Sequence, residues 1–195
     1  MDAFSEDRER FLFSIMTWKK GEDYFHYQNP VRCKEDPEPS LFEKAVLIPR
    51  SFYSAVPSEG LTSVGSDTLA SNASFLKRCS PLLYDPRFAD EQSAGSNMLH
   101  EAEVCEKLLH TPHPNICRYL GYVRSEIRLL VGLCFEKHIK DLDAAVEDKD
   151  DLDVDAIVEG IRAGLKHLHS SGFVHVRRAF DCADSHWSLM CCKTE

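Results

Sequence analysis

The hydrophobic pattern of residues 75–175 constrains the fold of this chain more than any other feature. In its first half, apolar residues recur at the spacing of one helical face, at Leu99, Ala102, Cys105, Leu108 and Leu109. Charged side chains, mostly glutamate, stand between them. Pro112 and Pro114 follow, and proline cannot continue a helix. The pattern therefore predicts an amphipathic helix that ends before Pro112.

Extended segments surround this helix. A strand is expected around residues 75–76, before the helix, and two more over residues 115–123 and 127–138, after it. Because Glu126 begins a tight turn between the last two, they should pair antiparallel. The sequence therefore predicts an α+β fold and argues against a doubly wound parallel sheet.

A second amphipathic helix is predicted after these strands. Its apolar stripe comprises Val154, Ile157, Val158, Ile161, Leu165 and Leu168. Either Asp151 or Asp153 can serve as its N-cap, and Gly172 can end it. The acidic run of residues 147–153 just before it reads as a loop.

Three phrases in this stretch resemble a protein kinase, and they occur in the kinase order. HEAEVCEKLLHTPHPNICRYLGY (100–122) resembles the αC helix and the strand after it. RLLVGLCFEKHIKDL (128–142) resembles the strand that enters the hinge, and IVEGIRAGLKHLHSSGFVH (157–175) resembles the helix that enters the catalytic loop. In their residue choice these segments are similar to divergent kinase-like proteins of filamentous fungi. The resemblance implies a kinase-like small lobe, an antiparallel sheet plus the αC helix, followed by the first helices of a large lobe.

The resemblance also implies a nucleotide site. Lys77 matches the lysine that contacts the ATP phosphates, and Glu101 matches the glutamate that holds this lysine in place. Glu103 is the competing choice for that glutamate. At the hinge, backbone groups of Phe135, Glu136 and Lys137 would bond the adenine edge. Cys134 or Phe135 would stand at the back of this pocket.

Two departures from the family bear on activity. The segment that should hold the phosphate-covering glycine loop contains only Gly60 and Gly65, at the wrong spacing, so ATP binding is expected to be weak. Val176 and Arg177 follow His175, where the family has the catalytic aspartate. An arginine stays charged and cannot accept the substrate proton.

The expected function follows from these matches and departures. The metal-binding asparagine and the Asp-Phe-Gly motif are also missing, so Mg²⁺ binding is not expected. The resemblance therefore implies an ATP-binding phosphotransferase of the Ser/Thr kinase family that is inactive in this form and has no catalytic or metal residues. Two alternatives are a pseudokinase-type binding or regulatory module and a non-functional truncated gene product. Translation of a retained intron would explain residues 176–195.

Four zones are expected along the chain. Residues 1–45 form an N-terminal extension that need not be ordered. Residues 46–138 would be the kinase-like small lobe, and residues 139–175 the start of the large lobe. Residues 176–195 would be a tail unrelated to the family. With large-lobe partners missing, the face formed by Ile157, Ile161, Leu165 and Leu168 should be partly exposed, and self-association or a protein partner would cover it.

Charge and composition exclude other classes. The formal net charge is -9, with 23 basic against 32 acidic residues, which disfavours a nucleic-acid partner. No apolar run is long enough to cross a bilayer and no signal peptide is recognisable, so a cytoplasmic or nuclear location is expected. The eight cysteines include no C-x-x-C pair, and Cys105, Cys117 and Cys134 are expected to be small buried hydrophobes.

Overall fold

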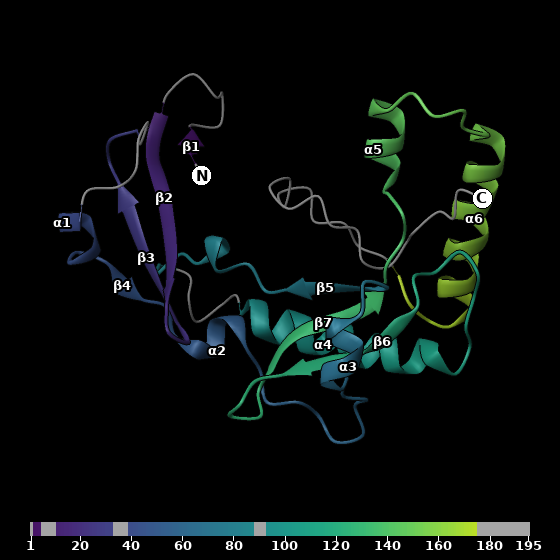
Figure 1. The fold of residues 1–195 in the computed structure, drawn as a ribbon, viewed down its shortest axis with the longest axis horizontal. Helices are drawn as coiled ribbons and strands as arrows, with labels where there is room; N and C mark the ends of the chain where they lie inside the picture. The colour runs from purple at the N-terminus through teal and green to yellow at the C-terminus, as the bar shows by residue number, and fades with distance from the viewer. Residues whose placement is uncertain (1, 5–10, 33–38, 88–92, 175–195) are drawn as a thin grey trace. The chain divides into compact units, whose positions relative to one another are not determined.

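The computed structural model describes residues 2–4, 11–32, 39–87 and 93–174. The chain divides into two compact units (Figure 1). The first unit joins residues 1–55 to residues 79–98, and the second joins residues 56–78 to residues 99–195. This division differs from the predicted zones, because the segment 79–98 returns to pack with the N-terminal residues.

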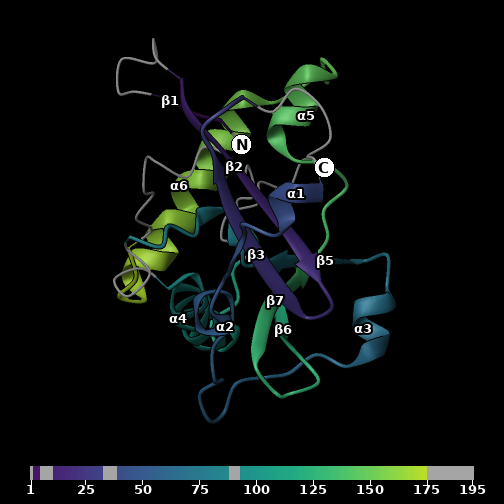
Figure 2. The same ribbon diagram turned by 90° about the vertical axis from the view of Figure 1, so that its left-hand side faces the viewer.

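The first unit contains a four-stranded antiparallel sheet in the order β1-β2-β3-β4. Its strands are β1 (Asp2–Phe4), β2 (Phe11–Lys20), β3 (Asp23–Asn29) and β4 (Val46–Leu47). Figure 2 shows β2 and β3 as a long hairpin. Trp18 on β2 stacks on its cross-strand partner Phe25, with ring centroids 6.0 Å apart. Over these strands the structure differs from the expectation of an extension that need not be ordered.

A small aromatic core holds the first unit together. Ile48, Phe52, Tyr53 and Tyr84 are its buried members. They come from β4 and its flank, from α2 (Arg50–Tyr53) and from the end of the 3-10 helix η1 (Pro81–Leu83), while α1 (Pro39–Phe42) precedes β4. The ring of His26 packs edge-on against Tyr84 at 5.4 Å. The segment 79–98 therefore belongs to this unit through its buried tyrosine.

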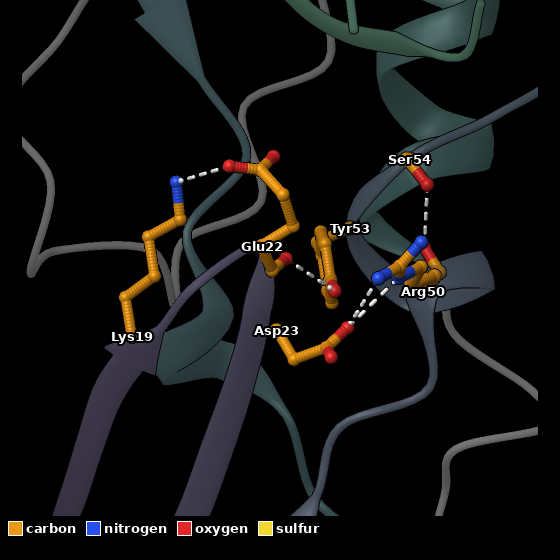
Figure 3. A network of polar contacts seen from close by, with 6 residues as sticks. All are labelled: Lys19, Glu22, Asp23, Arg50, Tyr53 and Ser54. Carbon is orange, nitrogen blue, oxygen red and sulfur yellow. Dashed lines mark hydrogen bonds and ion pairs between the residues drawn. The ribbon is translucent and has the colours of Figure 1, made fainter. Parts of the chain in front are cut away.

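A polar network ties α2 to the β2–β3 turn (Figure 3). The Arg50 guanidinium donates to the Asp23 carboxylate at 2.8 Å, and the Tyr53 hydroxyl donates to the Glu22 carbonyl at 3.3 Å. The Ser54 hydroxyl donates back to the Arg50 carbonyl at 2.7 Å and helps to end the helix. Because the Arg50–Asp23 pair is exposed, the network orients α2 more than it stabilises it.

The second unit contains a three-stranded antiparallel sheet in the order β5-β7-β6. Its strands are β5 (Ser74–Arg78), β6 (Tyr119–Arg124) and β7 (Leu130–Glu136), and α3 (Ser66–Ala70) precedes β5. The predicted antiparallel pair is confirmed, with strands somewhat shorter than expected. A turn closed by hydrogen bonds between Ser125 and Leu129 joins them. With its helices, the chain is an α+β protein.

Three longer helices complete the described chain: α4 (Ala94–Leu109), α5 (Leu142–Glu147) and α6 (Val154–Ser170). The helix α4 ends before Pro112 as predicted, but it begins earlier, at Ala94. Asp153 is the N-cap of α6, because its carboxylate accepts a hydrogen bond from the Ala156 N–H at 3.0 Å. None of the helices in the described ranges is both long and apolar enough to cross a membrane.

The helix α6 packs on the loop after α4. The Asn115 side chain donates to the Gly160 carbonyl at 2.7 Å, and a Cβ at Gly164 would lie 3.0 Å from the Asn115 carbonyl oxygen. His167 stacks on His113 at 4.9 Å. The predicted exposed face is therefore only partly correct: Leu168 is 2% exposed, whereas Ile157, Ile161 and Leu165 are half-buried.

The described cysteines behave as the sequence predicts. Cys105, Cys117 and Cys134 are buried free thiols, and Cys79 is a half-buried one. Burial in apolar surroundings suits cysteine, which behaves as a small hydrophobic residue. The other four cysteines lie outside the described residues.

Candidate functional site

A partly buried ion pair in the second unit joins Lys77 to Glu101. The Lys77 ammonium donates to both carboxylate oxygens of Glu101, at 2.8 and 2.9 Å. The two side chains are 27% and 17% exposed. Lys77 lies on β5, and Glu101 lies on α4, which therefore covers this face of the sheet. A bidentate, half-buried pair fixes an otherwise mobile lysine in one position.

The choice between Glu101 and Glu103 is thereby decided. Glu103 accepts a hydrogen bond from the Ser58 hydroxyl at 2.5 Å and lies away from Lys77. Two residues along a helix differ by about 200° in direction, so one helix cannot point both carboxylates at one lysine. Glu101 is the partner of Lys77.

The buried face of α4 lies against the sheet beside this pair. Three residues of the predicted stripe, Ala102, Cys105 and Leu108, are buried, and Leu99 is half-buried. Leu109 differs, because it lies at the exposed end of the helix. Burial raises the pKa of the Cys105 thiol to about 12, and the negative charge of Glu101 adds to this effect. Burial therefore favours the protonated form of this thiol.

Of the predicted hinge residues, Phe135 and Glu136 form the end of the central strand β7, and Lys137 follows it. Phe135 is fully buried and pairs with Phe75, so its side chain lies on the Lys77 face of the sheet. Cys134 pairs with Leu76 and points to the opposite face. Of the two residues proposed for the back of the pocket, only Phe135 lies on the lysine side.

Two N–H groups of the predicted hinge are engaged in hydrogen bonds within the fold. The Glu136 N–H donates to the Arg118 carbonyl, and the Lys137 N–H donates to the Ala73 carbonyl, both at 2.8 Å. Both donors therefore serve the fold. Within the described residues, the His138 N–H makes no hydrogen bond. The sequence analysis missed His138. Only the register of neighbouring strands shows which backbone N–H groups of the hinge are already hydrogen-bonded.

A hollow of about 670 Å³ lies beside the hinge. Cys105, Leu108 and Tyr119 contribute apolar surface to it, and the hinge contributes Glu136 and His138. This volume falls within the range of small-molecule sites. Lys77 and Glu101 do not line the hollow. The hollow and the ion pair are thus separate features of one unit, and α4 contributes to both.

The two candidate loop glycines, Gly60 and Gly65, belong to a segment that pairs with β6. Gly60 and Gly65 flank Ser63, which bridges to Tyr122 on β6. The strand β6 is at one edge of the sheet, and the Lys77 strand β5 is at the other. The pairing of this segment therefore places it beside β6 and gives no support to a glycine loop over Lys77.

Metal-ligating side chains do not cluster within the described residues. In the ranges that the structure describes, no three His, Cys, Asp or Glu side chains are arranged to hold a metal ion. His175, Val176 and Arg177, which bear on the expected catalytic loop, lie outside the described residues, as does the tail after them.

Comparison with known proteins adds no family to this geometry. No family model, curated protein or solved structure matches the chain.

Proposed function

We propose that this chain is a protein-kinase-like module that binds an adenine nucleotide without transferring its phosphoryl group. The observation that carries this proposal is the Lys77–Glu101 pair, with both carboxylate oxygens within 2.9 Å of the lysine nitrogen. An oriented ammonium on a sheet is the element that phosphate positioning requires. It stands on β5, paired directly to the strand that leads into the hinge.

The hinge supports a place for the base. Among the described residues, the His138 N–H is the first hinge donor that makes no hydrogen bond, and His138 also lines the adjacent hollow. Lys77 would hold the phosphates, and Glu101 would hold Lys77. Weak affinity is expected, because the glycine-bearing segment runs along the opposite sheet edge and leaves phosphate binding to fewer groups.

The sequence after α6 supports binding without transfer. Arg177 stands where the family has its catalytic aspartate, and a guanidinium cannot act as the general base. Incubation with labelled ATP should therefore produce neither phosphorylated protein nor ADP. Sustained ADP release that depends on this chain would contradict this part of the proposal.

Calorimetric titration of the full chain with ATP, with and without Mg²⁺, tests the binding. Lys77→Met should weaken binding at least about tenfold, because a hydrogen bond to a charged group contributes about 1.5–3 kcal/mol. Arg78→Ala is the matched control, since Arg78 is the exposed neighbour on the same strand and points to the other face. Its affinity should change less than about twofold.

Two results would overturn the nucleotide site. One is no ATP binding by the native chain at about 1 mM, the weak end of specific affinities. The other is equal affinity in Lys77→Met and the native chain. Either result would favour a kinase-like binding module without a nucleotide.

A further inference from the structure

Residues 58–64, here called the strap, connect α4 to the outer edge of β6. Ser58 donates to Glu103 on α4 at 2.5 Å. Thr62 makes two bonds to Glu106, from its backbone N–H at 2.6 Å and from its hydroxyl at 3.0 Å. The same stretch pairs with β6, where the Tyr122 N–H donates to the Thr62 carbonyl at 2.8 Å. The strap is thus bonded to the helix and the sheet at once.

The strap and Lys77 hold α4 from different sides. Successive helical residues turn by about 100°, so Glu103 and Glu106 lie about 60° apart and both point away from the direction of Glu101. Glu101 is bonded to β5 at one sheet edge, and Glu106 is bonded to the strap at the other. Rotation of α4 about its axis would therefore break both sets of contacts together.

We propose that the strap is a clamp that sets the position of Glu101 against Lys77, with Thr62 as its positioning residue. Thr62 contacts both oxygens of Glu106 and bonds β6 through its carbonyl, so it joins the helix directly to the sheet edge. Its side chain is exposed, so the hydroxyl can be changed without disturbing the core. The effect on nucleotide affinity rests on the function proposed above, whereas the clamp itself does not.

Thiol labelling, which needs no nucleotide, measures how readily the buried face of α4 becomes accessible to a reagent. Cys105 lies on the buried face of α4, and Cys134 lies in the central strand of the same unit. Thr62→Val removes the hydroxyl and keeps the size of the side chain. It should speed maleimide labelling of Cys105 about tenfold, the change expected for loss of a hydrogen bond to a carboxylate, and leave Cys134 unchanged. Thr62→Ser should restore the native rate.

Thr68→Val is the control, because Thr68 lies in α3, outside the strap. Thr62→Glu, which places a second carboxylate beside Glu106, should label Cys105 faster than Thr62→Val. Equal Cys105 labelling in Thr62→Val and the native chain would overturn the clamp. So would an equal acceleration at Cys105 and Cys134, because this would indicate general loosening of the unit.

Nucleotide titration of the same variants separates the two proposals. If the native chain binds ATP, Thr62→Val should weaken binding several-fold and Thr62→Ser should restore it. Unchanged affinity together with faster Cys105 labelling would overturn the link between the clamp and Glu101. If the native chain binds no ATP, the proposed function fails, and the Cys105 rates still decide whether the clamp exists.

Discussion

Gly121 provides a stability test of the contact between the strap and β6. Its φ is +137°, a conformation that residues with a Cβ rarely adopt. A Cβ at this position would lie 2.7 Å from the Thr62 carbonyl oxygen and 3.0 Å from a Val64 methyl carbon. Gly121→Ala would therefore strain the backbone and also push the strap away from the strand.

Gly60 separates these two effects. It has a φ of +88°, but a Cβ there would meet nothing within 4 Å. Positive φ costs a residue with a Cβ about 1–2 kcal/mol, and this is the whole effect expected for Gly60→Ala. Overpacking against a fixed backbone adds about 1–3 kcal/mol. Gly121→Ala should therefore destabilise the second unit by about 2–5 kcal/mol, or about 1–3 kcal/mol more than Gly60→Ala.

Urea unfolding followed by circular dichroism measures both losses, and hydrogen exchange in residues 119–124 locates them in the second unit. The Tyr122 N–H, which donates to Thr62, should lose protection in Gly121→Ala and keep it in Gly60→Ala. Equal losses of stability in the two variants would refute the close approach of the strap to β6.

Two further predictions concern the cores of the two units. Burial lowers the pKa of His26 below its usual 6.5, against the smaller opposing effect of Asp85. Because the unfolded chain then binds the proton more readily than the folded chain, stability should be lost as pH falls from about 7 to 5. Thermal melts of His26→Leu should show a smaller loss of stability over this range, and an acid dependence identical to that of the native chain would contradict the prediction. Leu168 is 2% exposed, so Leu168→Ala should lower the free energy of unfolding in urea by about 2–5 kcal/mol. Val154 is 64% exposed on the same helix, so Val154→Ala should lower it by less than about 0.5 kcal/mol. Similar decreases in the two variants would contradict the packing of α6.

The N-terminal hairpin shows where sequence reasoning fell short. Residues 11–29 are rich in aromatic and β-branched side chains and contain Gly21, which has a φ of +62° in the two-residue connection. Such a run around a glycine turn is a hairpin signal. The sequence analysis did not identify this signal and treated residues 1–45 as an extension that need not be ordered. Its core also depends on Tyr84, more than fifty residues along the chain, which no local pattern identifies.

Local patterns alone determined much of the second unit. The period of apolar residues predicted α4 and α6, Pro112 ended the first helix, and Asp153 was one of two candidate caps for the second. The turn at Glu126 predicted the antiparallel pair. These features depend on residues within a few positions of one another, where backbone geometry fixes which side chains share a face.

Only the tertiary structure decided which polar groups meet. The helical pattern allowed both Glu101 and Glu103 as the lysine partner, and the direction of α4 over the sheet selected Glu101. The register of the strands engages the N–H groups of Glu136 and Lys137 in hydrogen bonds, whereas within the described residues the N–H of His138 makes none. The strap brings Thr62 to Glu106 across 44 residues. Each of these contacts joins segments far apart in the chain, and their meeting depends on how whole elements pack, which residue periodicity does not encode.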